Sequence, residues 1–351
     1  MNEVSNNLIQ WYIANNYSFP WRKSSDPYKI WISEIMLQQT QVSTVVPYYN
    51  NWMSLFSNVE ILSRAPIQKV LKCWEGLGYY QRAHNIHETS KIIVQDFNGL
   101  IPEDYNNLIS LKGIGDYTAS AILSMAYNKK YPAIDGNLKR VVARMSGIAN
   151  FKKIIPKSKN IIMNLMTENN PGSLNQALMD LGREICLPQK PKCTVCPIST
   201  FCIAYTKNKI SYYTFIKKKN KKPIYNVSVG IIWKANKILI SKRKKDGLLG
   251  GLWELPGGKK HKNENDSECL LREINEELGI SVNIKNKIGT IKHHYSHFSI
   301  NLTAYNCEHF SGKAFACSSE KIEWIKISQI IQYPFPKATL KLFILAGLLN
   351  D

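Results

Sequence analysis

Leu111-Lys-Gly-Ile-Gly-Asp-Tyr-Thr-Ala119 is the stretch that decides the fold of the first half of this 351-residue chain. It lies between two helical patterns, which we expect over residues 102–110 and 116–126. The glycines let the backbone turn tightly and leave N–H groups at the start of the second helix free to bind phosphate without reading a base. A helix C-cap is the ordinary alternative for a Gly-x-Gly pair. The Tyr-Thr-Ala that follows instead favours a helix-hairpin-helix with Gly113 and Gly115 in its turn.

The rest of the chain divides by composition into two domains joined by a basic segment. Apolar residues recur three and four apart up to about Tyr205, as in helices, and strand patterns are nearly absent there. Residues 206–223 hold seven lysines and no acidic residue, which indicates a linker. We predict a multidomain protein with an all-α domain over 1–205, its helix-hairpin-helix at 102–127, and an α+β domain over 224–351. In the second domain we expect strands over 227–233, 237–241, 288–291 and 298–305, and a helix over 269–278.

The charge of the chain points to a polyanionic partner. Lys and Arg number 46 against 26 Asp and Glu, a formal net charge of +20, which favours nucleic acid over a membrane surface. A composition rich in Lys, Asn and Ile would account for part of this excess as solvated surface. No apolar run approaches the roughly 18 residues of a membrane span, and residues 1–13 lack the pattern of a secretory signal. We expect a monomeric protein of the cytoplasm, associated with the nucleoid.

Half of the eight cysteines are clustered in one short segment, with the spacing C-x6-C-x2-C-x5-C. A reducing cytosol disfavours disulfides between them, so a site of four thiolates is expected. Zinc and a [4Fe–4S] cluster both accept four thiolates, and spacing alone does not separate them. The expected ligands lie in the loop 186–202: Cys186, Cys193, Cys196 and Cys202.

Two acidic residues occur in contrasting surroundings. Glu34 lies in a predicted helix with apolar residues on its own face, and such surroundings raise the pKa of a carboxyl group and suit it to act as a general acid. Asp135 precedes a predicted helix, where N–H groups and the helix dipole should favour its ionised form. An acid and an anionic stabiliser together are the pattern expected for cleaving a glycosidic bond.

Residues 20–205 resemble the helix-hairpin-helix DNA glycosylases that carry an iron–sulfur cluster, and specifically the adenine DNA glycosylases of the MutY type. The resemblance rests on four segments: Pro20-Trp-Arg22, Ser33-Glu-Ile-Met-Leu-Gln-Gln-Thr-Gln-Val42, Trp74-Glu-Gly-Leu-Gly-Tyr-Tyr80 and Asp135-Gly-Asn-Leu-Lys-Arg140. It implies that Glu34 is the general acid acting on a flipped-out adenine and that Asp135 stabilises the cation formed at the sugar. By the same resemblance, Asn137 orients water or Asp135.

The resemblance also assigns residues that contact DNA, and the cofactor. Trp21 and Arg22 would line the adenine pocket, whereas Gln39 and Tyr79 would wedge into the base stack. The segment 175–186 resembles the approach to the cluster in these glycosylases, which favours one [4Fe–4S] cluster with a structural role over zinc. Double-stranded DNA that carries adenine opposite 8-oxoguanine or guanine is the implied partner.

Position 117 separates this chain from a related thymine-glycol glycosylase, endonuclease III. That enzyme carries a lysine two residues after the second hairpin glycine, where it forms a Schiff base. This chain has Tyr117 there, so it lacks the amine nucleophile. We expect hydrolysis of the glycosidic bond in base excision repair without cleavage of the strand.

The second domain contains a complete Nudix box, G-x5-E-x7-R-E-U-x-E-E-x-G-U, over residues 258–280. Adenine glycosylases of this type carry a Nudix-like domain whose metal-binding carboxylates are usually lost, so the intact box is a departure. It leaves two interpretations: a retained scaffold that inspects the opposite base, or a hydrolase of nucleoside diphosphate derivatives. In the second case Mg²⁺ would bind at Glu273, Glu276 and Glu277.

The segment His293-His-Tyr-Ser-His297 resembles the Phe-Ser-His loop by which these enzymes recognise 8-oxoguanine, with Tyr295 in place of Phe. 8-Oxoguanine presents an N7–H donor where guanine has an acceptor, and the hydroxyl of Ser296 can accept from it. His297 completes the loop. A histidine cluster at a sheet edge, or a metal site made by His293 and His297, is the alternative. A cluster-bearing protein that binds DNA without catalysis is a further rival, but the presence of both Glu34 and Asp135 argues against it.

Overall fold

The structure is a computed structural model that describes residues 2–15, 17–150, 154–168, 170–214 and 222–350. The chain forms two compact units, one of Met1–Arg64 and Asn85–Lys218 and the other of Ala65–His84 and Lys219–Asp351. None of the helices in the described ranges combines the length and the apolar character that crossing a membrane requires.

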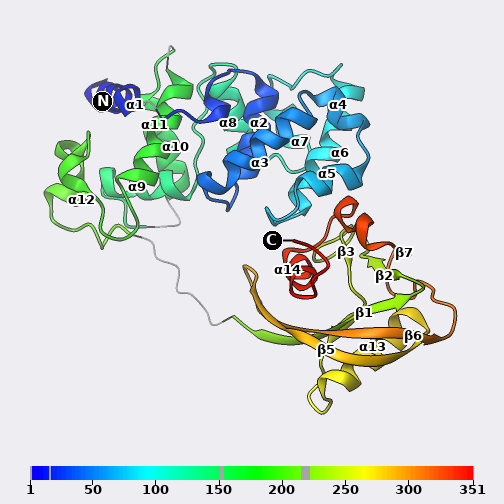
Figure 1. Cartoon of the computed structure of the whole chain (residues 1–351). Coiled ribbons are helices and arrows are strands. Elements are labelled where there is room, and N and C mark those ends of the chain that lie inside the picture. The colour runs from blue at the N-terminus through cyan, green and yellow to red at the C-terminus, as the bar shows by residue number, and fades with distance from the viewer. Residues whose placement is uncertain (1, 16, 151–153, 169, 215–221, 351) are drawn as a thin grey trace. The chain divides into compact units, whose positions relative to one another are not determined.

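Helices and short 3₁₀ turns make up the regular structure of the described residues as far as Thr214, as the sequence predicts (Figure 1). The α-helices are α1 (Asn2–Asn15), α2 (Pro27–Leu37), α3 (Val42–Leu55), α4 (Val59–Arg64), α5 (Ile67–Cys73), α6 (Gln81–Asp96), α7 (Tyr105–Ser110), α8 (Asp116–Met125), α9 (Gly136–Ser146), α10 (Ile154–Leu165), α11 (Pro171–Glu184) and α12 (Ile203–Thr206). The 3₁₀ turns in this part are η1 (Pro20–Arg22), η3 (Cys193–Val195) and η4 (Ser199–Phe201).

Helix α9 shows how local sequence and packing fix this unit. Asp135 caps its N-terminus by accepting a hydrogen bond from the Leu138 N–H, and Gly147 ends it in the left-handed conformation (φ 64°). Its apolar face packs in one buried cluster with residues of α1, α10 and α11, including Leu8, Ile162 and Leu178. Burial of this kind stabilises the helix more than its intrinsic propensity does. The helix places Asp135 and Asn137 at one end and Arg140 and Arg144 one and two turns further along.

The predicted helix-hairpin-helix is present as α7 and α8, and both lie within the ranges expected from the sequence. Gly113 has φ +84°, and a Cβ there would come within 2.8 Å of the Asn85 side chain. Gly115 is the N-cap of α8, and a Cβ placed there would meet nothing within 4 Å. The hairpin therefore needs Gly113 for its turn, and it leaves open space at Gly115 in front of the helix N-terminus.

The C-terminal part of the second unit is a mixed β-sheet, in the order β3-β2-β1-β6-β5, with β4 paired to β1 and β7 to β2. Strands β1 and β6 run parallel, and the other pairs are antiparallel. The bounds are β1 (Ile224–Lys234), β2 (Lys237–Lys242), β3 (Trp253–Glu254), β4 (Gly257–Lys259), β5 (Ser281–His294), β6 (Ser299–Ser311) and β7 (Lys321–Ile325), with helices α13 (Asp266–Leu278) and α14 (Lys337–Leu345) and the 3₁₀ helix η5 (Ile327–Gln332).

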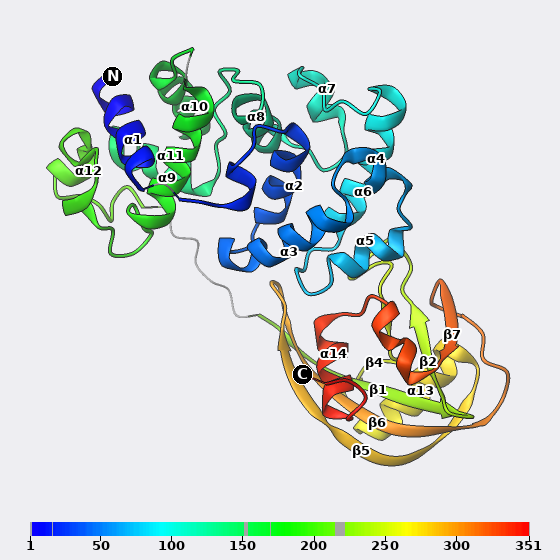
Figure 2. The ribbon, with the colours of Figure 1, turned by 45° about the horizontal axis from the view of Figure 1, so that its top comes forward.

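The two helices cover opposite faces of this sheet (Figures 1 and 2). On one face Ile274 and Leu278 of α13 pack in a cluster with Leu239 of β2. On the other face Leu342 and Phe343 of α14 join the cluster that contains Ile238 and Ile240, the β2 residues on either side of Leu239. This alternation along one strand is the two-residue period of a sheet buried on both faces.

The predicted strands are present, but one of them is much longer than expected. Residues 288–291 form the middle of β5, which runs from Ser281 to His294 and pairs with β6 along its length. Irregular register between Ile284 and Asn286 and between Lys287 and Gly289 interrupts the alternation that would have marked the whole strand in the sequence. In the predicted linker, Lys217, Lys218, Lys219 and Lys221 lie outside the described residues.

Candidate active site

A cavity of about 750 Å³ in the first unit brings together side chains from α2, α8, α9, α11 and the 3₁₀ turn η1. Of the predicted site residues, its lining includes Trp21, Arg22, Glu34, Tyr117, Asp135 and Asn137. They come from four separate segments of the sequence. The tertiary structure therefore collects the predicted catalytic and base-pocket residues of this unit at one place.

Glu34 is a buried acidic residue of the cavity lining. It lies in the third turn of α2, and only 4% of the residue is exposed. Burial raises its pKa from 4.5 to about 7, against a lowering by the Tyr117 hydrogen bond and by Arg22. Asp135 adds to the increase through like-charge repulsion. A carboxyl group with this pKa is partly protonated at neutral pH, and the rise in pKa is the one that the sequence predicts for Glu34.

Tyr117 has a partner that its sequence position does not reveal. Its hydroxyl donates a hydrogen bond of 2.7 Å to Oε2 of Glu34, from the first turn of α8. Burial raises the pKa of this hydroxyl well above 10, so it remains a donor at any pH at which Glu34 titrates. Tyr117, at the position where endonuclease III has its lysine, therefore holds the Glu34 carboxyl group in place.

Asp135 caps α9 as predicted, but its pKa moves in the direction opposite to the expected one. Its Oδ1 accepts from the Leu138 N–H at 2.6 Å, and the Asn137 N–H and Arg140 also favour the ionised carboxylate. Burial outweighs these contributions, so the pKa is raised above 3.8. The expected direction was wrong because the cap pattern in the sequence does not specify how deeply the Asp135 carboxyl group is buried. Asp135 still differs from Glu34 because backbone N–H groups solvate its charge.

The side chain of Asn137 faces the cavity but bonds to Arg140 (Nη2 to Oδ1, 3.0 Å). Arg140 also donates to the carbonyl oxygens of Gly182 and Cys186, at 2.7 Å each. A Cβ on Gly182 would come within 2.8 Å of the Asn137 Cβ, so α9 and α11 pack in close contact here. The hydrogen bonds connect the cavity wall to the first cysteine of the predicted cluster loop.

Arg22 is fixed at the cavity by an acidic residue that the sequence analysis did not single out. Its guanidinium donates to both carboxylate oxygens of Asp180, which is 2% exposed, at 2.5 and 3.0 Å. The same guanidinium lies 5.0 Å from the ring centre of Phe19, which stacks on Trp21 at 5.3 Å. Asp180 lies in the segment 175–186, and an acidic residue on the apolar face of α11 was the signal available for finding it.

The four clustered cysteines follow α11, in a segment with two 3₁₀ turns. They are free thiols of intermediate exposure. The pKa of Cys193 is raised first by burial and then by the neighbouring Cys186 and Cys202, so the sulfur atoms lie close enough to interact electrostatically. Arg144, 2% exposed, donates to Cys186 Sγ at 3.3 Å and also to the carbonyls of Leu187 and Pro188. Four cysteines in one short loop, one of them bonded to a buried guanidinium, suit an anionic thiolate-bound group.

Within the described parts of the chain, no three His, Cys, Asp or Glu side chains are grouped closely enough to hold a metal ion as they stand.

Gln39, predicted to wedge into the base stack, follows α2 in the left-handed region with φ 56°. This conformation is uncommon for a non-glycine residue and is often found at functional positions.

The predicted recognition loop is the tip of the β5–β6 hairpin. Ser296 and His297 are exposed, whereas Tyr295 is partly buried against His293 and Phe298. Burial raises the pKa of Tyr295 to about 12. Ser296 has a partner from the distant segment 65–84: its Oγ accepts a hydrogen bond of 2.5 Å from the hydroxyl of Tyr79. Tyr79, predicted to wedge into the base stack, and Ser296, predicted to recognise 8-oxoguanine, are thus neighbours in the second unit.

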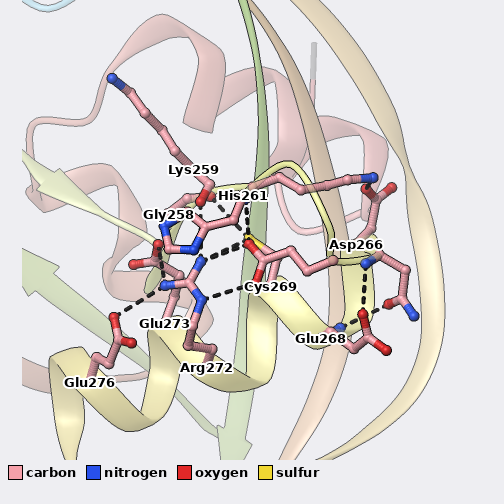
Figure 3. A network of polar contacts seen from close by, with 12 residues as sticks. Gly258, Lys259, His261, Asp266, Glu268, Cys269, Arg272, Glu273 and Glu276 are labelled. Atoms are coloured by element: carbon pink, nitrogen blue, oxygen red, sulfur yellow. Dashed lines mark hydrogen bonds and ion pairs between the residues drawn. The ribbon is translucent and has the colours of Figure 1, made fainter.

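The Nudix box forms a network centred on Arg272 of α13 (Figure 3). Its guanidinium donates to both oxygens of Glu264, at 2.8 and 3.0 Å, and lowers the pKa of that carboxyl to about 2. It also donates to Glu273 at 3.0 Å and Glu276 at 3.1 Å. Glu277 instead accepts from the Gly257 N–H, and burial raises its pKa to about 7. Glu273 and Glu276 thus share the single charge of Arg272 with Glu264, and Glu277 is bonded to a backbone N–H. In this arrangement the three predicted Mg²⁺ ligands are not grouped as a cation site among the described residues.

Comparison with known proteins gives matches to both halves of the chain. The family described as HhH-GPD superfamily base excision DNA repair protein matches residues 32–166, and the NUDIX domain family matches residues 228–345. The adenine DNA glycosylase of Buchnera aphidicola subsp. Schizaphis graminum (strain Sg) is 35% identical over 342 residues, which cover 95% of this chain and 96% of that protein. The adenine DNA glycosylase of Homo sapiens is 28% identical over 357 residues, which cover 85% and 65%.

Solved structures support the helical fold. A thermostable thymine-DNA glycosylase is similar with a TM-score of 0.55 and 29% identity, over 58% of this chain and 95% of that chain. An endonuclease III from a non-covalent complex with DNA has a TM-score of 0.50 and 20% identity, over 57% and 94%. The second likeness concerns the fold alone.

Proposed function

Because this chain belongs to the adenine DNA glycosylases, enzymes of base excision repair, we propose that it hydrolyses the N-glycosidic bond of adenine mispaired with 8-oxoguanine or guanine in double-stranded DNA. The observation that carries the proposal is Glu34. It is a buried acid with a pKa of about 7, bonded to Tyr117 and lining one cavity with Asp135.

The chemistry follows from the two carboxyl groups. Protonated Glu34 donates its proton to the extruded adenine as the bond between its N9 and the sugar C1′ breaks, so the base leaves neutral. The Asp135 carboxylate stabilises the oxocarbenium-like sugar. Water then adds to C1′ and gives its proton to the Glu34 carboxylate that the first step produced. Tyr117 keeps Glu34 in position through the 2.7 Å hydrogen bond. Tyr117 offers no amine, so the strand stays intact, and the enzyme is monofunctional.

The hairpin and the recognition loop support the choice of duplex. N–H groups at the start of α8, beside the open position at Gly115, suit a backbone phosphate. Exposed Ser296 and His297 at the β5–β6 tip can reach a base edge, and an acceptor oxygen on Ser296 suits the N7–H of 8-oxoguanine.

The cluster loop completes the proposal. Cys186, Cys193, Cys196 and Cys202 would hold one [4Fe–4S] cluster, with Arg144 as a cationic neighbour. When bound, the cluster supplies no chemistry to the cleavage step but closes the loop after α11. Arg140 then keeps this loop against the cavity wall through the Cys186 carbonyl.

The experiment is a comparison of duplexes that carry adenine opposite 8-oxoguanine, adenine opposite guanine, or thymine glycol, with strand breaks scored before and after alkali. We expect adenine release from the first two and strand breaks only after alkali. A borohydride-trapped covalent intermediate, or release of thymine glycol at the adenine rate, would overturn the proposal.

The complete Nudix box favours hydrolysis of a nucleoside diphosphate derivative as a second candidate function. For that reaction, Mg²⁺ would have to replace Arg272 at Glu273 and Glu276. The test is diphosphatase activity of the intact protein with Mg²⁺, compared with Glu276→Gln. Activity that this variant lacks would support the second function, and its absence from the wild type would leave the domain as a reader of DNA.

A further inference from the structure

We propose that Gln68 and Glu75 are positioning residues that hold Tyr79 against Ser296 and thereby set the selectivity for the base opposite adenine. The inference rests on the proposed function, because it concerns the reading of that base. In addition to the hairpin loop, α5 and the turn after it would then determine how Tyr79 and Ser296 lie relative to each other. Gln68, Glu75, Tyr79 and Ser296 all belong to the second unit.

Gln68 connects α5 to the segment that leads into β3. Its amide nitrogen donates to the Gly251 carbonyl at 3.1 Å, and its amide oxygen accepts from the Trp253 indole N–H at 2.9 Å. Trp253 is 3% exposed. The indole N–H of a buried tryptophan usually has a partner, so loss of the Gln68 amide would leave this group unsatisfied.

Glu75 makes the second connection, to the segment before α14. Its Oε1 accepts from the Phe335 N–H at 2.6 Å, and its Oε2 pairs with Lys72 Nζ at 2.7 Å. Lys72 in turn donates to the Tyr333 carbonyl at 3.0 Å. Hydrogen bonds to an ionised carboxylate, here from a backbone N–H and from an ammonium group, are stronger than hydrogen bonds between neutral groups.

Close packing surrounds these hydrogen bonds. Gly251 has φ +77°, and a Cβ there would lie 3.1 Å from both the His84 ring and the Leu71 side chain. His84 also bonds through Nε2 to the Gly250 carbonyl at 3.0 Å. We call the hydrogen bonds of Gln68, Lys72, Glu75 and His84 to the C-terminal residues the α5 contacts. They fix segment 65–84 on the sheet domain at several points.

The α5 contacts affect recognition of the opposite base because segment 65–84, which they hold in place, also carries Tyr79. Its turn is held internally by hydrogen bonds from the Trp74 indole and from Arg82 to the Gly78 carbonyl, both 3.0 Å. The Arg82 guanidinium lies 5.4 Å from the Tyr79 ring centre. Tyr79 has a left-handed φ of 50° and bonds to Ser296, 217 positions away in the chain. The segment and the hairpin tip therefore present their two hydroxyl groups as one pair.

Loss of an α5 contact should change selectivity and leave cleavage intact. None of Gln68, Glu75 and Tyr79 belongs to the cavity lining that contains Glu34 and Asp135. Discrimination between 8-oxoguanine and guanine depends on one hydrogen-bonding edge, so a displacement of well under 1 Å at Ser296 weakens it. Proton donation by Glu34 does not use this edge.

The test uses the full chain and the variants Gln68→Leu and Glu75→Leu. Single-turnover rates of adenine release and duplex dissociation constants are measured for adenine opposite 8-oxoguanine and opposite guanine. We expect the preference for 8-oxoguanine to fall by roughly 3- to 10-fold, the effect of about one lost hydrogen bond, while the saturated release rate stays within about twofold of wild type. Gln95→Leu, at an exposed position of α6, is the matched control.

Two further variants exclude a general loss of structure. Trp253→Phe removes the indole N–H while it keeps an aromatic ring, so it should reproduce the loss of preference in part. Glu75→Gln retains an acceptor for the Phe335 N–H, so it should keep most of the preference that Glu75→Leu loses. In a Ser296→Ala background, Gln68→Leu should add almost nothing to the loss of preference, since it acts through that residue.

Three results would overturn the inference alone: an unchanged preference in Gln68→Leu, equal losses of rate on both duplexes, or losses that add fully to those of Ser296→Ala. A wild-type enzyme that releases adenine at one rate from both duplexes would instead overturn the proposed selectivity, and the positioning role with it. The two failures are therefore distinguished by the wild-type measurement.

Discussion

Replacing Glu34 by Gln should abolish adenine release and at the same time make the protein more stable at alkaline pH. The folded-state pKa of Glu34 is about 7, against 4.5 for the free group, because the carboxyl is buried. Between these values the folded state binds more protons than the unfolded state, so the stability of the wild type falls as pH rises through this window and is constant above it. The difference between pH 5 and pH 8 amounts to roughly 2 to 3 kcal/mol, because each pKa unit corresponds to about 1.4 kcal/mol. A glutamine does not titrate and avoids this loss.

The assay is urea unfolding of the wild type and Glu34→Gln at pH 5 and pH 8, with adenine release and duplex binding measured on the same samples. Glu103→Gln, with a side chain 64% exposed, is the matched control and should show no pH-dependent gain. Adenine release in Glu34→Gln should fall by at least about 10²-fold, the usual contribution of a general acid, with duplex binding nearly unchanged. If the stability difference between Glu34→Gln and the wild type were the same at pH 5 and pH 8, the raised pKa of Glu34 would be refuted. Substantial adenine release by Glu34→Gln would show that Glu34 is not the general acid.

The remaining predictions concern the pH profile, the recognition loop and the cluster. The single-turnover rate of the wild type should decline as pH rises through about 7, because the acid form of Glu34 is lost. Tyr117→Phe removes a hydrogen bond that lowers the pKa of Glu34, so in this variant the decline should move to higher pH. A pH profile that does not move would contradict the contact between Tyr117 and Glu34. Ser296→Ala with His297→Ala should reduce the preference for 8-oxoguanine over guanine more than general duplex binding, and equal losses in competition binding would place recognition elsewhere. Cys196→Ser should reduce the bound iron and sulfide of the purified protein, measured chemically, whereas Cys317→Ser, at an exposed site outside the loop, should leave both unchanged.

Local sequence determined the features that depend on a few neighbouring residues. The turn at Gly113 needs a backbone conformation that glycine adopts readily, so the helix-hairpin-helix could be read from residues 111–119. Asp135 before a helical pattern predicts an N-cap, and the structure has it. The helical pattern over 269–278 predicts most of α13, but the helix begins earlier, at Asp266, after the capping box of Asn265 and Glu268. These signals lie within a few turns of the chain.

Only the tertiary structure determined the pKa shifts and the hydrogen-bond partners of the site residues. The sequence places Asp135 at a cap, but the depth of burial that raises its pKa depends on the helices packed around it. Tyr117 bonds to Glu34 across 83 positions and Asp180 to Arg22 across 158, and no local pattern encodes such separations. Residues 65–84 read as ordinary helical-domain sequence, yet they belong to the second unit, where Gln68 and Glu75 hold them. The physical reason is that burial and hydrogen bonding are properties of the packed chain, whereas periodicity and capping are properties of its neighbouring residues.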